Sequence, residues 1–518
     1  MDAPEDKPDR KQVPLAGDEQ PLAYRAVRGS LWSVGSAYWV IGFGFVANIL
    51  LTRLLTPAVY GDFALAVFFA TLFQLRSKVA LGYAFAQQPV IDGKAVGSYF
   101  VVDLLLGLAS LVIGLVAAPI LIGLGYAPNV AWMMVALVGV GVLGSLSSVF
   151  GVVLEKKLHF KPGSVITSVA MPLSYLPAFG LALNGFGQYS LIAQALTVVL
   201  LQEAGFWVYV WRRMQLVFAL QWRFDRVLAR KMLRFGATTG FGGFLVGTTS
   251  QVDNFLLGTL GGATALGYYD RAFRMAQWPS LLLNSLTGRA TLLTYTALRD
   301  YPLQLQKTMG MVFWVSANVA LPLVLALFIS APDLVLWLYG PVWAPVAPLL
   351  RILVLAALLR PVLDNLLTLA VALGQPRRLV ETAVVQLGVL ILLGIPLTVR
   401  WGASGTAVAA VVTVGVGVAV IVLRLSPELL YKPLRSFRGP VAAATLTVIV
   451  YVLVLRLVDT NSLALWLRVA VKFGYAFGAY GLLLLILGPQ GARERVRYVY
   501  RLARGGQEFA PLVDRGDP

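Results

Sequence analysis

Hydrophobic residues in this chain are gathered into long runs, which short polar or basic segments separate. Fourteen runs can be traced, at about residues 29–53, 60–80, 97–122, 129–153, 163–184, 189–211, 235–258, 266–296, 309–330, 343–372, 380–399, 403–423, 440–457 and 464–488. A helix needs about 20 apolar residues to cross the hydrocarbon core of a bilayer. The runs are too long, and too continuously apolar, to be the alternating strands of a membrane barrel. The pattern predicts an all-α integral membrane protein with about 14 transmembrane helices.

Composition supports this class and narrows the chemistry. Of 518 residues, 58% are hydrophobic and only 13% are charged, whereas soluble domains carry about 25% charged residues. A soluble enzyme and a disordered chain are both excluded. Cysteine is absent and His159 is the only histidine, so thiol chemistry, disulfides and multi-histidine metal sites are excluded or disfavoured. We therefore expect neither enzyme activity nor a metal or other cofactor.

The basic residues are distributed unevenly along the chain. Lys and Arg number 42 against 24 Asp and Glu, a net charge of +18. If the N-terminus is cytoplasmic, 32 of the 42 lie in cytoplasmic segments, and only Arg53, Arg400 and Arg456 lie at outer ends. Positive residues gather on the cytoplasmic side of membrane proteins. The distribution predicts two cytoplasmic termini, and it explains the charge without a nucleic-acid partner.

The two halves of the chain resemble each other. At an offset of 206 residues, eight of the 34 positions from 28 to 61 are identical, Val40 with Val246 among them. The other pairs are Arg28 and Arg234, Val46 and Val252, Asn48 and Asn254, Leu50 and Leu256, Leu51 and Leu257, Leu54 and Leu260, and Gly61 and Gly267. Both halves start on the cytoplasmic side, which predicts a parallel repeat. Such repeats are typical of transporters whose substrate path lies between the halves.

The repeat and the charge runs divide the chain. We expect a disordered cytoplasmic tail (1–24), an N-lobe of six spans (25–211), a basic amphipathic cytoplasmic linker (212–234), a C-lobe of six spans (235–424), two additional spans (425–490) and a basic cytoplasmic tail (491–518). The linker and the segment 493–504 mix Arg with apolar residues, which suits helices lying on an anionic inner leaflet. Gly236 and Gly240 are spaced for close helix packing.

Two arginines lie inside the eighth predicted span. Arg271 and Arg274 are about 8–12 Å below its outer edge. A charge at that depth is costly unless it faces water or a partner, so both are candidate sites for an anionic substrate. The structural alternative is that Asp270 pairs with Arg274 one helical turn away.

Other polar residues inside the spans give further candidates. Gln251, Asp253 and Asn254 fall in the outer third of the seventh span, where Asp253 could meet Arg271 or Arg274 as a gate, a protonatable switch or a static ion pair. Arg76 lies near the cytoplasmic end of the second span and could bind an anionic head group or serve as a positive-inside anchor.

Four more charged positions inside the spans receive a structural role or no role. Arg360 and Asp364 flank Pro361 and are more simply a structural pair than a substrate contact. We assign no role to the isolated acids Asp103 and Glu203.

Several segments resemble a known family. LLTRLLTPAVYGDFALAVFF (50–69), QVDNFLLGTLGGATALGYYDRAFRMAQWP (251–279) and WAPVAPLLRILVLAALLRPVLDNLLTLAVALGQP (343–376) are similar to polysaccharide exporters of the multidrug/oligosaccharidyl-lipid/polysaccharide (MOP) superfamily. QLRSKVALGYAFAQQPV (74–90) and YYDR (268–271) match arginine motifs of the more distant lipid II flippases. The resemblance implies two lobes around a central cavity and assigns Arg76 and Arg271 to its cationic lining. Asn48 stands where those relatives carry a further arginine.

The resemblance implies a flippase of the bacterial inner membrane. Its substrate would be an oligosaccharide repeat unit on undecaprenyl pyrophosphate, moved by alternating access for surface polysaccharide synthesis. Other partners would be anionic inner-leaflet lipids and the polymerase and glycosyltransferases of the same pathway. A multidrug or cation antiporter is an alternative that needs an acidic cavity. A polymerase or ligase would need a large periplasmic loop, and a non-transporting scaffold of a glycan assembly complex would not need buried arginines.

Overall fold

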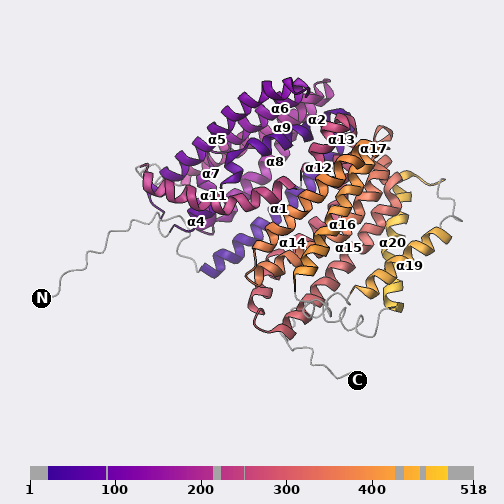
Figure 1. Cartoon of the computed structure of the whole chain (residues 1–518). Helices are drawn as coiled ribbons and strands as arrows, with labels where there is room; N and C mark the ends of the chain where they lie inside the picture. The colour runs from indigo at the N-terminus through magenta and orange to yellow at the C-terminus, as the bar shows by residue number, and fades with distance from the viewer. Residues whose placement is uncertain are drawn as a thin grey trace. The chain divides into compact units, whose positions relative to one another are not determined.

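The computed structural model describes residues 22–88, 91–213, 223–249, 251–425, 437–454 and 462–487. Within these ranges the regular elements are all helices, as predicted (Figure 1). In the described residues, each of the fourteen apolar runs is mainly helical. Eight of the described helices are long and apolar enough to cross a membrane, or nine if the bent pair of α6 and α7 forms one span. The total of 14 spans stays a prediction, and both termini lie outside the described residues.

Two compact units make up the chain. The first comprises residues 1–270 with two later insertions, 338–343 and 390–406, and the second comprises the remainder. The helices that lie in the first unit are α1 (Leu22–Leu54), α2 (Pro57–Phe73), α3 (Leu75–Lys78), α4 (Leu81–Ala86), α5 (Gly93–Gly123), α6 (Pro128–Leu143), α7 (Ser148–Lys156), α8 (Phe160–Leu183), α9 (Gly187–Arg213), α11 (Arg226–Thr249), α12 (Val252–Leu260) and the first part of α13 (Gly262–Ala276).

Local chemistry explains where several of these helices begin and end. Pro57 and Pro128 stand in the first turn of α2 and α6, where a missing N–H has no cost. The side chain of Asp92 caps α5 by accepting a hydrogen bond from the Ala95 amide at 2.8 Å. The second predicted span breaks at Gln74, between α2 and α3, and the fourth bends by 49° between α6 and α7. These breaks expose backbone carbonyls inside the bundle.

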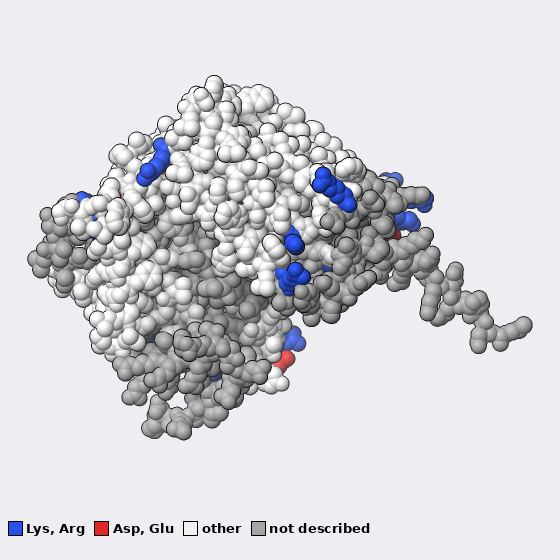
Figure 2. Space-filling model, turned by 180° about the vertical axis from the view of Figure 1, so that it is seen from behind, with Lys and Arg blue, Asp and Glu red and all other residues white. Residues whose placement is uncertain are grey.

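Within the first unit, α8 packs between α1 and α9, and α6 packs against α2 and α5 (Figure 1). A buried cluster that includes Phe85, Tyr99 and Phe150 joins α4, α5 and α7 to α9 and α11. Most of the described surface on the face that Figure 2 presents is uncharged, as expected for helices surrounded by lipid.

The second unit holds the later helices. They are the rest of α13, α14 (Trp278–Ala297), α15 (Pro302–Leu338), α16 (Val346–Ala372), parts of α17 (Arg377–Arg424), α19 (Arg438–Val454) and α20 (Leu465–Leu487). Within α17, Gly402 has a φ of 57°, which divides the element into two segments that match the eleventh and twelfth predicted spans. Arg360 and Asp364 form the predicted pair within α16, at 3.2 Å.

The two predicted additional spans, α19 and α20, pack against α15 through buried apolar residues, and α20 also forms ion pairs with it. Ala326 of α15 is buried with Ala443 of α19 and Ala476 of α20. Near this core the Asp333 carboxylate of α15 pairs with Lys472 and lies 3.9 Å from Arg468, both from α20. Removing one member of such a group would leave an uncompensated charge, which is destabilising.

The boundary between the units differs from that of the predicted lobes. We expected the C-lobe to begin at 235, whereas α11 and α12 group with the first unit. The reason is close packing at two glycines: an added Cβ would lie 2.8 Å from Val79 at Gly236 and 2.3 Å from the Lys78 carbonyl at Gly240. The packing role predicted for these glycines is therefore confirmed, and the lobe boundaries stay a prediction.

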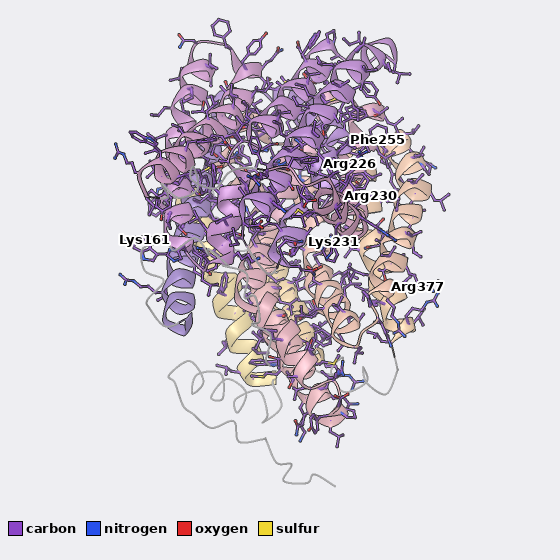
Figure 3. All side chains as sticks on the ribbon, turned by 90° about the vertical axis from the view of Figure 1, so that its left-hand side faces the viewer. Lys161, Arg226, Arg230, Lys231, Phe255 and Arg377 are labelled. Carbon is purple, nitrogen blue, oxygen red and sulfur yellow. The ribbon has the colours of Figure 1, made fainter. Side chains whose placement is uncertain are left out.

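The predicted linker is described in part. Residues 214–222 lie outside the described residues, and α11 begins at Arg226. In its first turns Ala229 and Met232 are buried, while the basic residues Arg226, Arg230 and Lys231, labelled in Figure 3, are exposed. Val227 and Leu233 are exposed as well, so the amphipathic character of the linker stays a prediction.

Candidate functional site

The backbones of α2 and α13 cross in direct contact at two glycines. A Cβ added to Gly61 would lie 1.7 Å from the carbonyl oxygen of Ala263, and one added to Gly267 would lie 1.8 Å from that of Pro57. The offset of 206 residues relates Pro57 to Ala263 and Gly61 to Gly267. Equivalent positions of the two halves thus meet across a local two-fold axis, and only glycine fits at either contact.

An aromatic cluster lies beside this crossing. Trp343, from the short helical turn Pro341–Trp343, is 1% exposed, and its indole N–H donates to the Thr52 carbonyl at 3.1 Å. Its ring lies 5.7 Å from that of Tyr60 in α2 and 6.0 Å from that of Tyr268 in α13. Trp343 therefore contacts three helices: α1 through the Thr52 carbonyl, α2 through Tyr60 and α13 through Tyr268.

Asp253 is the centre of a buried polar group in α12. Its Oδ2 accepts a hydrogen bond from the Tyr269 hydroxyl at 2.6 Å, and its Oδ1 accepts one from the Asn254 amide at 2.9 Å. The Asn254 side chain donates to Gln251 at 2.8 Å. In the described part of the chain, Oδ1 of Asn254 is buried and has no hydrogen-bond partner. The structure thus brings three predicted residues together and adds Tyr269.

The remaining candidates of this region are divided between the units. Asp270 ends the first unit and is buried, and Arg271, the first residue of the second, is only 3% exposed. Arg274, one turn later, is exposed. A contact of Asp253 with either arginine stays a prediction, as does pairing of Asp270 with Arg274. Asn48 lies in α1, where its carbonyl accepts from the Thr52 hydroxyl at 2.7 Å.

Arg76 occupies the point where two spans are broken. Its Nε donates to Asp103 Oδ1 at 2.7 Å, while Nη1 and Nη2 donate to the carbonyls of Gly141 and Gly144 at 3.0 and 2.9 Å. Those carbonyls belong to the bend between α6 and α7, so the guanidinium satisfies acceptors that the bend exposes. The second oxygen of Asp103 accepts from the Ser148 hydroxyl at 2.5 Å.

This arrangement leaves Arg76 partly accessible. Three of its five N–H groups have the partners above, and its side chain is 28% exposed. A cavity of about 260 Å³ is lined by Arg76, Gln74 and Ser110. The site is therefore a firmly oriented cation at the wall of a small cavity in the first unit.

Sequence reasoning found some of these residues and missed others. Asp103 was an isolated acid in the sequence, because its partner lies 27 positions earlier on a different helix. Tyr269 belongs to the YYDR motif but gave no sign that it would hydrogen-bond to Asp253. Trp343 has no signal beyond its aromatic side chain. No group of three or more acidic or histidine side chains in the described ranges is placed to hold a metal.

Comparison with known proteins gives a family and a fold. A family model described as "Polysaccharide biosynthesis protein" matches residues 50–348. The succinoglycan biosynthesis transport protein ExoT of Rhizobium meliloti (strain 1021) is 26% identical over 327 residues, which are 63% of this chain and 65% of ExoT, just under two thirds of that relative's length. The lipopolysaccharide biosynthesis protein WzxC of Escherichia coli (strain K12) is 22% identical over 350 residues, covering 66% of this chain and 68% of WzxC.

Two solved structures share this fold. The lipid II flippase MurJ, in its inward closed conformation, matches with a TM-score of 0.70 at 13% identity and covers 90% of this chain and 100% of the MurJ chain. An inward-facing multidrug resistance MATE family transporter of the MOP superfamily matches with a TM-score of 0.51 at 16% identity, covering 79% and 94%. At these identities the likeness shows the fold, which is that of a multi-pass membrane protein.

Proposed function

Because this chain belongs to the polysaccharide biosynthesis protein family of the MOP superfamily, we propose that it is a flippase for lipid-linked oligosaccharides. It moves repeat units attached to undecaprenyl pyrophosphate from the cytoplasmic to the periplasmic leaflet of the bacterial inner membrane. The observation that carries this proposal is the family match, which covers more than half of the chain. The fold shared with a lipid II flippase supports the same kind of transport.

The substrate's pyrophosphate binds to arginines. Arg271, the arginine of the YYDR motif, is almost fully buried in the second unit. A guanidinium can hold two phosphate oxygens at once. Arg274 adds an exposed charge one turn away on the same helix. Arg76, held by Asp103 beside its cavity, serves as a second anion site in the first unit.

Alternating access requires a gate, and the crossing of α2 and α13 supplies one. With the predicted orientation both glycine contacts lie toward the outer face, where we place the gate. Asp253 and Asn254 lie on α12, which precedes α13, and they respond to its position through the Tyr269 hydroxyl. Gln251 and Asp270 flank the same segment, and Asn48 is the counterpart of Asn254 in the first half. We assign these residues to gating and coupling.

The proposed function also implies lipid and enzyme partners. The exposed bases at the start of α11 suit the anionic lipids of the inner leaflet. The glycosyltransferases that build the repeat unit supply the substrate, and the polymerase that joins units consumes the product.

A deletion strain tests the proposal. Without the protein, undecaprenyl-linked repeat units should accumulate on the cytoplasmic leaflet, and the corresponding surface polysaccharide should be missing. Leaflet location is measured by adding a glycosidase to sealed vesicles of known orientation. If the units reach the periplasmic leaflet at the wild-type rate and only their polymerisation fails, the proposed function is wrong.

A further inference from the structure

A groove of about 650 Å³ runs between α1 and α8 in the first unit. Its walls include Trp32 and Trp39 from α1 and Val165 and Val169 from α8. These side chains are not covered: Trp39 is 53% exposed and Val169 is 54% exposed. An open apolar groove on a membrane helix pair has the form of a site for a hydrocarbon chain.

Polar side chains of the groove form hydrogen bonds between α1 and α8. The Ser36 hydroxyl donates to the Ser164 carbonyl at 2.9 Å and lies 2.8 Å from the Ser168 hydroxyl. The Trp39 indole N–H donates to the Ser168 carbonyl at 3.0 Å. These bonds fix α1 against α8. They also turn the polar edges inward, so that the groove presents mainly hydrocarbon and the faces of indole rings.

One end of the groove is positively charged. Arg28 lines it and is exposed. Lys161, also exposed and labelled in Figure 3, places its ammonium group 5.1 Å from the centre of the Trp32 ring. From Arg28 to Trp39 the helix rises about 16 Å, which is close to half of the roughly 30 Å hydrocarbon core. With the predicted orientation, the basic end lies at the cytoplasmic surface and the apolar part spans the inner leaflet.

We infer that this groove binds the polyprenyl chain of the substrate, with the diphosphate held by Arg28 and Lys161, before the sugar enters the transport path. The inference rests on the proposed function. A diphosphate offers one phosphate to each cation, and Arg and Lys both bind phosphate oxygens well. The methyl branches and flat double bonds of a polyprenyl chain suit branched valines and indole faces better than they suit a polar wall.

Photo-crosslinking of the full-length protein in phosphatidylcholine nanodiscs tests this inference. The probe is undecaprenyl diphosphate with a diazirine on its chain, and mass spectrometry locates the attached peptides. We expect attachment to residues 28–39 and 164–169. Neutralising one cation by Arg28→Gln or Lys161→Gln should weaken probe binding about tenfold, the usual effect of losing one charge-assisted contact.

Blocking the groove in protein that has already folded distinguishes loss of probe binding from loss of protein stability. An added Cβ at Gly35, which lines the groove, or at Gly42, two turns deeper on α1, would meet no atom within 4 Å. The chain has no cysteine, so Gly35→Cys and Gly42→Cys can each be alkylated with N-ethylmaleimide in folded protein. Alkylation at position 35 should abolish crosslinking in the groove, and alkylation at position 42 should not.

Three results would overturn the inference. They are attachment of the probe elsewhere, crosslinking that persists after alkylation at position 35, and equal displacement of the probe by phosphatidylglycerol, which would indicate a general anionic-lipid site. Each can occur while the wild-type protein still flips its substrate in proteoliposomes, and the proposed function then stands. Failure of the wild-type protein to flip would overturn the proposed function itself.

Discussion

Replacing Gly61 by alanine should open the crossing of α2 and α13. The new Cβ would begin 1.7 Å from the Ala263 carbonyl oxygen, and real Cβ contacts are almost never shorter than 3.0 Å. The obstructing atom is backbone, so the two helices must move apart by more than an ångström. Overpacking of this kind costs about 1–3 kcal/mol, which corresponds to a shift of about 5- to 150-fold away from the closed arrangement.

Thiol labelling measures that shift. Ala64 lies one turn along α2 from Gly61 and is 4% exposed, so Ala64→Cys reports separation of the helices. In the Gly61→Ala background, a membrane-impermeant maleimide added from the periplasmic side should label this cysteine about 5- to 150-fold faster. The symmetry of the crossing predicts the same for Gly267→Ala.

The matched control is Gly180→Ala in α8, where an added Cβ meets no atom within 4 Å. There the substitution should stabilise the helix slightly, because alanine restricts the unfolded chain more than glycine does. Labelling at the wild-type rate in Gly61→Ala, with transport intact, would refute the assignment of this crossing as a gate.

Three further predictions concern Arg76, Arg271 and the topology. Asp103→Asn should lower thermal stability and export together, because it leaves the Arg76 charge without its carboxylate; unchanged melting and export would contradict the described pair. Arg271→Ala should abolish export at normal membrane abundance, and Arg271→Lys should retain part of it; a loss of abundance alone would indicate a structural role. A cysteine at the exposed Asn184 should be labelled from the periplasm, and one at the exposed Arg377 should not; periplasmic labelling at Arg377 would overturn the orientation.

Much of the fold could be predicted because the bilayer imposes a strong constraint on the sequence. Each apolar run had to be a helix, since no other regular element satisfies its own backbone in lipid without closing a barrel. The interruptions were harder to place. The bend between α6 and α7 exposes backbone carbonyls, and the hydrogen-bond donors that satisfy them come from Arg76, which is distant in sequence and takes this role only when the helices are packed.

For the same reason, some residues of the candidate site could be predicted from the sequence and others could not. Asp253 and Asn254 stood out as polar residues in an apolar run, and the structure places them in one buried network. Asp103 stood out equally, but nothing in the sequence joins it to Arg76. The glycine pair was visible as one identity among several in the repeat. That Gly61 and Gly267 meet equivalent backbone atoms follows only from the three-dimensional crossing.

The central claim is that this chain moves lipid-linked oligosaccharides between leaflets, and reconstitution tests it most directly. Purified protein is placed in liposomes that carry a fluorescent oligosaccharide on undecaprenyl pyrophosphate in both leaflets, and a membrane-impermeant reagent quenches the outer label. With active protein, quenching should proceed beyond the outer-leaflet fraction to near completion, and Arg271→Ala should stop it at that fraction. Quenching that halts at the outer-leaflet fraction with wild-type protein, under every imposed ion gradient, would contradict the account.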